Sequence, residues 1–546
     1  MTHDWEEYAL DDVTGAELPL DLVRAARREE MGHVLSKTLK VVPIAEAYQK
    51  TGKAPISTKW VDVDKSHGAG EMFVRSRLVA RDFREKGEKD REDLFSATPP
   101  LELIRLMISR QATIREDGGE RKTLFLDVKK AHLIPKCEQD VYVELPEEAG
   151  ARSDECGKLE YWLYGCRPAA QAWEEHYSKV LGGAGFKRLV SCPVAFVHES
   201  RDVMGVAHGD DFIFVGMDPD LDYTLDVMKA HFELKDRGRL GSGETDVKEV
   251  EILGRRVRWN EWGLTWQADP RHRDILMEYF GMNGVTKALG RNGYKEDRVE
   301  GGYEDIPLDG NEAKAFRVLA ARLNYVAQDD PSVQYAAKEV CRRMSAPTAR
   351  DFMTVKRLVR FMVGVREVQW CFPWQCEAEA RVIKVHVDSD WAGCERTRKS
   401  TSGGCILVGR HLLRSWSSTQ AVVATSSAEA ELYGMCEGAS RGLGLQAMMG
   451  ELGLSVRMFV CTDSAAAKSF ASTRGLGRMR HIEVRELWLQ ELVQKGRLQL
   501  LKVDGATNPA DALTKHHDLR KISELMSRVG MNVVPAAHRG RSEGGC

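Results

Sequence analysis

Two adjacent carboxylates, Asp210 and Asp211, stand between two apolar runs at residues 203–207 and 212–215. Apolar runs on either side of a short polar bend predict a β-hairpin that carries the acids at its tip. Adjacent carboxylates repel each other, and burying them is costly unless a cation lies between them. A hard divalent ion such as Mg²⁺, which prefers oxygen ligands, is the natural partner. Asp127 ends another largely apolar run, and it would supply a third carboxylate to the same ion.

A second set of acids lies near the ends of elements expected in the last third of the chain. These acids are Asp388, Glu431, Asp463 and Asp511. Taken singly, an aspartate at a helix N-terminus or a glutamate on an exposed helix needs no catalytic role. Four acids at element ends, in the order β-β-β-α-β-α-α-β-α, favour a metal site instead. Asp390 and Glu429 are near neighbours that could exchange roles with Asp388 and Glu431.

Composition limits the class of protein. The chain has 546 residues, enough for three or four domains. Its 79 basic and 82 acidic side chains nearly cancel, so any surface that binds nucleic-acid phosphates must be local. The 12 cysteines include no Cys-x-x-Cys pair, and no run approaches the roughly 18 apolar residues of a membrane helix. With no signal-peptide pattern at the N-terminus, we expect an intracellular protein, cytoplasmic or nuclear, that contacts no membrane.

Basic residues gather in three places that would suit phosphate contacts, since arginine supplies bidentate hydrogen bonds. They are Lys59 with Arg75, Arg77, Arg81, Arg84 and Lys86; then Arg255, Arg256 and Arg258; and finally Arg478, Arg480 and His481. An ordinary solvated surface explains each cluster equally well when it is taken alone.

Several short motifs follow one another along the chain. They are Thr58-Lys-Trp-Val, Arg77-Leu-Val-Ala-Arg, Phe125-Leu-Asp-Val-Lys, Leu163-Tyr-Gly, His208-Gly-Asp-Asp, Trp391-Ala-Gly, Arg398-Lys-Ser-Thr-Ser-Gly-Gly and Arg480-His-Ile-Glu-Val-Arg. This series resembles the reverse transcriptase and ribonuclease H portion of the Pol polyprotein of copia-type LTR retrotransposons, from about residue 20 to residue 515. An isolated Asp-Asp pair more often lies in a solvated turn. The collinear series of motifs favours a metal site for Asp210 and Asp211 instead.

The resemblance implies an α+β multidomain fold, in which a right-hand polymerase with fingers, palm and thumb precedes an α/β ribonuclease H-like domain. The expected parts are an N-terminal helical extension, 1–55; fingers and palm, 56–262; a mainly helical thumb and connection, 263–380; the ribonuclease H-like domain, 381–515; and a C-terminal tail, 516–546.

It also implies two activities, RNA-directed DNA polymerisation and ribonuclease H cleavage of RNA–DNA hybrids, each with two Mg²⁺ or Mn²⁺ ions. The catalytic metal ligands would be Asp127, Asp210 and Asp211 in the palm, and Asp388, Glu431, Asp463 and Asp511 in the nuclease. The expected partners are an RNA template, a DNA primer, an RNA–DNA hybrid and dNTPs, and the oligomeric state stays open. Nucleotide or nucleic-acid contacts are expected from Lys59, Arg77, Arg81, His132 and Arg480.

Three departures from the family pattern motivate an alternative. His208 and Gly209 stand where an aromatic–apolar pair precedes the aspartates. Pro168 replaces a glutamine near the nucleotide, and His132 replaces an aromatic residue that would discriminate against 2′-hydroxyls. The alternative is a decayed or domesticated copy that binds nucleic acid without polymerising. No histidine lies in the loop 503–509, so no general acid is expected there.

Overall fold

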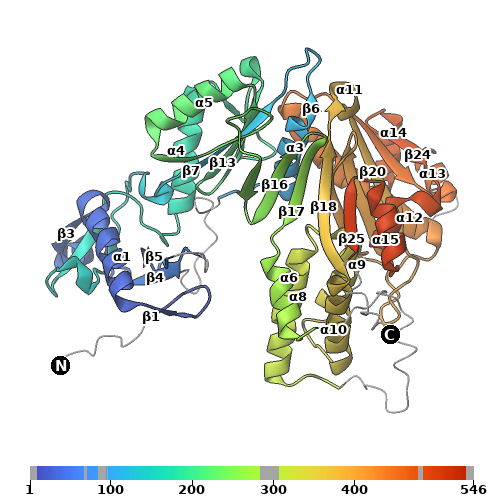
Figure 1. Ribbon diagram of the computed structural model, residues 1–546. Helices are drawn as coiled ribbons and strands as arrows, with labels where there is room; N and C mark the ends of the chain where they lie inside the picture. The colour runs from blue at the N-terminus through green and yellow to red at the C-terminus, as the bar shows by residue number, and fades with distance from the viewer. Residues whose placement is uncertain are drawn as a thin grey trace, which may run out of the picture.

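The computed structural model describes residues 9–66, 71–83, 94, 96–282, 306–476, 482 and 484–535. Figure 1 shows a first half, blue to green, beside a second half that runs from yellow to red. Helices and sheets alternate throughout, and the expected α+β multidomain fold is confirmed. Within the described ranges, the helices are too short or too polar to cross a membrane.

The central sheet of the first half, which we call the palm, is antiparallel. Its strands follow the order β10 (Lys187–Arg188), β11 (Ala195–His198), β12 (Val203–His208), β13 (Asp211–Gly216), β7 (Lys122–Val128) and β14 (Leu234–Leu240). Successive residues of a strand point to opposite faces. Leu124 therefore shares a core with α4 (Ala169–Gly183) and α5 (Asp218–His231), while Phe125 joins the core beneath α3 (Leu101–Gln111). Both faces are buried, so polar chemistry is left to the ends of the strands.

The region that we call the fingers is formed from two antiparallel strand pairs, a three-stranded sheet and two helices. The elements are β1 (Ala9–Leu10), β2 (Glu17–Leu18), α1 (Leu20–His33), β3 (Leu39–Pro43), α2 (Ile44–Thr51), β4 (Thr58–Asp64), β5 (Val74–Ala80), β8 (Tyr142–Val143) and β9 (Glu155–Leu159). β4 pairs with β5, and α1 packs on β5. The segment 1–55 is not only helical, because β3 pairs with β9 and sets Leu39 opposite Leu159.

A second antiparallel sheet links the two halves. Its strands are β15 (Glu249–Ile252), β16 (Arg255–Asn260), β17 (Gly263–Ala268), β18 (Val365–Pro373) and β25 (Met531–Pro535), and its helices are α6 (Arg271–Tyr279), α8 (Gly310–Val326), α9 (Pro331–Cys341) and α10 (Ala349–Val363). The helices expected in 263–380 are present, and α6 to α10 lie between the strands β17 and β18. β25 and α15 (Leu519–Ser527) come from the segment expected to be a tail, and β25 completes the sheet by pairing with β18.

The C-terminal domain is built on a mixed sheet. Its strands follow the order β22 (His411–Thr419), β21 (Thr401–Val408), β20 (Val382–Ser389), β23 (Arg457–Thr462) and β24 (Gln499–Lys502). β20, β21 and β22 are antiparallel, whereas β23 and β24 run parallel to β20. The helices are α12 (Ser427–Glu451), α13 (Ala465–Ala471), α14 (Trp488–Gln494) and the 3-10 helix η8 (Pro509–Leu513). This is the order of elements that the sequence predicts.

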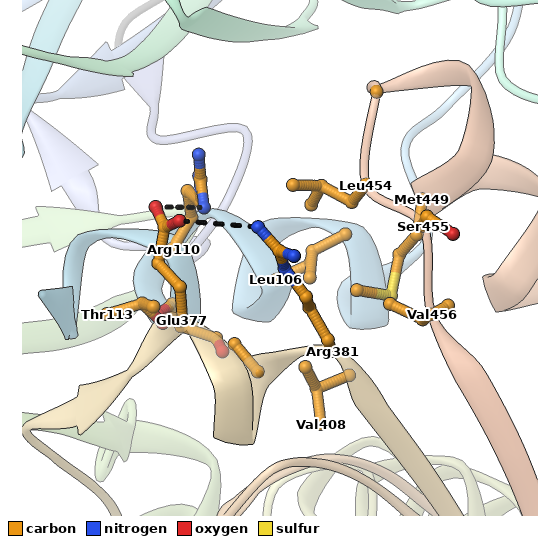
Figure 2. Close-up of a pocket in the computed structure, with 13 residues that line it drawn as sticks. Leu106, Arg110, Thr113, Glu377, Arg381, Val408, Met449, Leu454, Ser455 and Val456 are labelled. Carbon is orange, nitrogen blue, oxygen red and sulfur yellow. Dashed lines mark hydrogen bonds and ion pairs between the residues drawn. The ribbon is translucent and has the colours of Figure 1, made fainter. Parts of the chain in front are cut away.

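A pocket marks the seam between α3, the short helix α11 (Glu377–Ala380) and the end of α12 (Figure 2). Thr113 of β6 (Thr113–Ile114) also lines it, and β6 pairs in parallel with β19 (Gln375–Cys376). Glu377 pairs with Arg110 at 3.4 Å and with Arg381 at 3.9 Å. One glutamate therefore pairs with both arginines that line this pocket.

A buried carboxylate, Asp329, joins the palm, the linking sheet and the C-terminal domain. It accepts hydrogen bonds from Arg105 of α3 at 2.7 Å and from Trp266 at 2.9 Å, and it pairs with Arg255 at 2.9 Å. Arg105 also donates to the carbonyl oxygen of Leu413 in β22, at 3.1 Å. Burial opposes the charged form of Asp329, but the two guanidinium groups outweigh it and lower its pKa. Arg255, grouped by sequence with phosphate-binding arginines, is therefore a buried structural residue.

Replacing Asp329 with alanine should destabilise the protein strongly, because two buried guanidinium groups would lose their shared carboxylate. We expect the free energy of unfolding to fall by about 3–5 kcal/mol in urea denaturation. Glu199→Ala, which removes the exposed pair with Lys187, is the control and should change it by less than about 1 kcal/mol. Equal effects of the two substitutions would contradict this role.

Candidate active sites

The palm hairpin places three of the predicted acids at one end of the sheet. Gly209 has a φ of +64°, which a glycine adopts readily, and it turns the chain between β12 and β13. Asp211 lies directly opposite Asp127 in the β13–β7 register. The backbone N–H of Val128 donates to the carbonyl oxygen of Asp210 at 2.8 Å, and Trp173 of α4 donates to the carbonyl oxygen of Gly209 at 2.7 Å. The predicted meeting of Asp127 with the 210–211 bend is therefore present.

An arginine bridges two of these carboxylates. The Nη2 atom of Arg237 lies 2.8 Å from Asp127 Oδ2 and 3.0 Å from Asp211 Oδ1. Arg237 belongs to β14, at an irregularity in its pairing with β7 between Asp236 and Arg239. Burial, together with the neighbouring Asp210 and Asp127, raises the pKa of Asp211 even though Arg237 opposes this. The chain thus supplies its own cation to the acids, a residue that the sequence pattern did not single out.

Asp210 interacts electrostatically with residues of the fingers. Its charge acts on His132 and on Lys65. The His132 ring lies 5.8 Å from that of Tyr164, and the Arg77 guanidinium lies 5.3 Å from the same Tyr164 ring. Burial lowers the pKa of His132, against the opposing effect of Asp210. Two of the predicted nucleotide contacts, Arg77 and His132, therefore lie around one tyrosine beside the palm acids.

The other predicted contacts are placed differently. Lys59 Nζ lies 4.0 Å from Asp12 Oδ1, in the fingers. Arg81 is exposed, and its backbone N–H donates to Ser57. Arg480 lies outside the described residues. The charge of Asp210 acts on Lys65, which the sequence did not suggest.

Three acids of the C-terminal domain form a compact cluster. One carboxylate oxygen from each of Asp388, Glu431 and Asp463 lies within 4.8 Å of the others. Asp388 stands near the end of β20, Glu431 in the second turn of α12, and Asp463 directly after β23. Because β20 and β23 are adjacent and parallel, their carboxyl ends present these acids at one edge of the sheet.

A stripe of glycines lets α12 approach β20 closely. Gly434, Gly438 and Gly442 recur at one-turn spacing along α12. A Cβ on any of them would come within 3.0 Å of Ser389, Val387 or Val385, respectively. Only the absence of side chains at these positions permits the contact, and the contact brings Glu431 against Asp388.

The electrostatics of the cluster fit a divalent cation. Burial, followed by the charges of Asp388 and Asp463, raises the pKa of Glu431 to about 8. Burial also raises the pKa of Asp388 to about 6, although a hydrogen bond from Thr514 opposes this. Glu431 Oε1 accepts from the N–H of Ser389 at 3.2 Å, whereas its buried Oε2 has no hydrogen-bond partner among the described residues. Such an oxygen, beside two further carboxylates, is the donor set that Mg²⁺ or Mn²⁺ prefers.

The two neighbouring acids are engaged elsewhere. The carboxylate of Glu429 accepts from the N–H of Thr425 at 2.8 Å and from the Tyr433 hydroxyl at 2.6 Å. Asp390 accepts from the N–H of Thr401. The structure therefore favours Asp388 and Glu431 over Asp390 and Glu429 as the partners of Asp463.

Asp511 lies beside the cluster and has basic partners of its own. It pairs with Lys515 and, at 2.9 Å, with His517 Nε2. Burial opposes the charged form of Lys515, but Asp511, Asp388 and Asp463 outweigh it and raise the pKa of the lysine. The loop before Asp511 holds no histidine, whereas His517, which contacts Asp511, comes after it. The site is thus three clustered acids with a fourth, cation-bound acid at its margin.

Comparisons with known proteins show what the chain is similar to. Residues 43–242 match the family model described as reverse transcriptase (RNA-dependent DNA polymerase). The chain is 26% identical, over 97% of its length, to the retrovirus-related Pol polyprotein from transposon TNT 1-94 of Nicotiana tabacum. It is 25% identical, over 88% of its length, to that from transposon RE1 of Arabidopsis thaliana. The chain spans 39% and 32% of the length of these relatives. A solved foamy viral protease-reverse transcriptase in complex with RNA/DNA hybrid matches 88% of this chain and 54% of its own, at 10% identity and a TM-score of 0.48.

The metal-free protein should lose stability as the pH rises, because Glu431 holds a proton in the folded state that the unfolded chain releases. The loss builds up between the ordinary glutamate pKa and about 8. Glu431→Gln removes this pH-dependent loss of stability. In EDTA, the thermal midpoint of the variant should therefore rise relative to that of wild type by about 5 °C between pH 5 and pH 9. Glu491→Gln, whose side chain is exposed on α14, is the control and should show no such trend. Mg²⁺ should shrink the difference between Glu431→Gln and wild type. If the two thermal midpoints differ by the same amount from pH 5 to pH 9, the raised pKa of Glu431 is refuted.

Removing Arg237 should strengthen cation binding in the palm, because its guanidinium competes for Asp127 and Asp211. In a Glu431→Gln/Asp463→Asn background, which weakens the other site, we expect Arg237→Gln to lower the Kd for Mn²⁺ roughly tenfold, the equivalent of about 1.4 kcal/mol. Isothermal titration without nucleotide measures this directly. Arg239→Gln is the matched control, because Arg239 pairs with Asp218 and Asp222 instead. Unchanged or weaker Mn²⁺ binding by Arg237→Gln would show that the arginine does not compete.

Proposed function

Because the chain carries a reverse transcriptase domain of the copia-type retrotransposon Pol family, we propose that it copies RNA into DNA and cleaves the RNA strand of the resulting hybrid. The observation that carries the first activity is the register of β13 and β7 within the matched residues, which sets Asp211 opposite Asp127 at the hairpin of Asp210. The expected substrates are dNTPs and a DNA primer on an RNA template.

In the palm, Asp127, Asp210 and Asp211 would hold two Mg²⁺ or Mn²⁺ ions. Such ions would lower the pKa of the primer 3′-hydroxyl and neutralise the negative charge of the triphosphate. Arg237 must release Asp127 and Asp211 before they can bind metal. On the fingers side, Arg77 and Lys65 would contact triphosphate oxygens, since both lie near the acids and carry positive charge. His132, whose ring is tilted against that of Tyr164, would contact the sugar and exclude a 2′-hydroxyl.

In the C-terminal domain, Asp388, Glu431 and Asp463 would hold the ions, with Asp511 beside them. Supplied there, the ions activate water for attack on the RNA phosphodiester. Glu431 must lose a proton to bind metal near neutral pH, because its pKa is about 8 in the absence of metal ions. Lys515 and His517 hold the Asp511 carboxylate, and they would orient it toward the site.

The second candidate is a copy that binds nucleic acid without polymerising. The pairing of Arg237 with both Asp127 and Asp211 favours it, since this contact must break for catalysis. Pro168 does not disturb the fold, because it precedes α4 and its carbonyl oxygen accepts from Ala172 at 2.9 Å.

The two activities should separate by substitution. On poly(rA)/oligo(dT) with Mg²⁺ or Mn²⁺, wild type should incorporate dTTP, and Asp210→Asn should lower the rate at least about 100-fold, since it removes a metal ligand. Glu431→Gln should extend the primer normally but lose cleavage of a labelled RNA–DNA hybrid, while Asp210→Asn keeps it. Equal incorporation by wild type and Asp210→Asn, or none by either with intact hybrid binding, would reject polymerisation in favour of the second candidate.

A further inference from the structure

A basic hollow of about 520 Å³ lies where the linking helices meet the C-terminal domain. The residues that argue for its role are Lys338 and Arg342 of the α9 region, Arg414, Trp416 and Ser417 of β22, and Arg441 of α12. They come from three elements that are far apart in sequence, and the fold brings them together at the edge strand of the nuclease sheet.

The hollow carries an excess of positive charge. Four cations line it, and among the described residues that line it there is no acid. Their carboxylate partners stand behind the wall. Glu339 serves both Lys338, at 2.5 Å, and Arg342, at 3.0 Å, while Glu102 pairs with Arg414 and Glu437 pairs with Arg441 at 2.7 Å. The charge of Asp390 also acts on Lys338, so the carboxylates hold the cations in place while the lining of the hollow itself carries positive charge alone.

The cations are held in place rather than spread in solvent. Their side chains are only 13% to 33% exposed. Lys338 also donates to the Thr401 hydroxyl at 2.8 Å, and the Arg441 guanidinium lies 5.0 Å from the centre of the Trp416 ring. Preorganised, partly dehydrated cations bind an anion more strongly than mobile surface lysines do, because little ordering or desolvation remains to be done.

Hydrogen-bond donors without partners lie in the same wall. Trp416 is 5% exposed, and its Nε1 atom has no hydrogen-bond partner in the described structure. The Ser417 hydroxyl is likewise buried and unpartnered. Buried donors of this kind are rare in folded proteins and signal a missing acceptor. A phosphate group supplies both the negative charge and the acceptor oxygens.

We propose that this hollow binds a backbone phosphate of the RNA–DNA hybrid and so forms a docking point for the nucleic acid outside the nuclease acids. The placement fits, because Lys338 contacts Thr401 and Arg342 contacts Cys394 at 3.1 Å, residues of the segment that follows Asp388. The identity of the ligand rests on the proposed function, whereas the phosphate chemistry rests on the hollow alone.

The test compares Arg342→Gln/Arg441→Gln with Arg152→Gln/Arg528→Gln, a matched double substitution at exposed arginines that pair with Glu155 and Glu524. A fluorescein-labelled 18-base-pair RNA–DNA hybrid is titrated by anisotropy in EDTA, where neither active site turns over. The hollow variant should bind about tenfold more weakly and lower the salt slope by roughly 1 per lost phosphate contact. The control should stay within about twofold of wild type.

Trp416→Phe provides a second variant that keeps the ring and all four cations. It should weaken hybrid binding about threefold, with an unchanged salt slope, because only a neutral hydrogen-bond donor is lost. This result distinguishes a direct contact from a general loss of folding, because misfolding would change both the affinity for the hybrid and the salt slope.

Tripolyphosphate, titrated calorimetrically, distinguishes the sources of phosphate. Weaker binding of both tripolyphosphate and hybrid by the hollow variant supports the proposal. Loss of tripolyphosphate binding alone would overturn the hybrid as ligand and leave a small-anion site. Equal hybrid binding by wild type and hollow variant also overturns the proposal, whereas absence of hybrid binding by wild type would sink the proposed function itself.

Discussion

Repulsion between carboxylates held close together is the constraint on which both candidate sites depend. In the palm it is relieved by Arg237, which bridges Asp127 and Asp211. In the C-terminal domain it appears as the raised pKa of Glu431 and Asp388, and Lys515 stands at the margin. An isolated ionised cluster would be unstable in such surroundings. Each site therefore has a metal-free form that is neutralised from within, by an arginine or by protons.

The fold keeps the acids together by backbone geometry rather than by side-chain packing. Strand register fixes Asp211 opposite Asp127, and the parallel neighbours β20 and β23 bring Asp388 and Asp463 to one edge. Glycines of α12 then allow Glu431 to approach. Because these constraints act through the main chain, a substitution of one acid should leave the positions of the others nearly unchanged.

Much of this could be read from the sequence, since the strand–acid pattern around Asp127 and Asp210 is local. The order of elements after residue 381 was also predictable from hydrophobic periodicity. The features that could not be predicted depend on residues that are far apart along the chain. β3 and β25 are short strands whose pairing with β9 and β18 has no local signal. From the sequence alone, Arg255 looks like a phosphate contact. In the structure it is buried and pairs with Asp329, which lies far along the chain.

Helix α9 gives a physical route between the two halves of the molecule. Its N-cap, Asp330, follows Asp329, which holds Arg105 of the palm helix α3. At its other end, Lys338 and Arg342 contact residues of the segment after Asp388. The helix has 11 residues and is about 16 Å long. A short helix that is held at one end by the buried Asp329–Arg105 ion pair, and at the other by hydrogen bonds to Thr401 and Cys394, fixes the sheet of the C-terminal domain relative to the palm sheet.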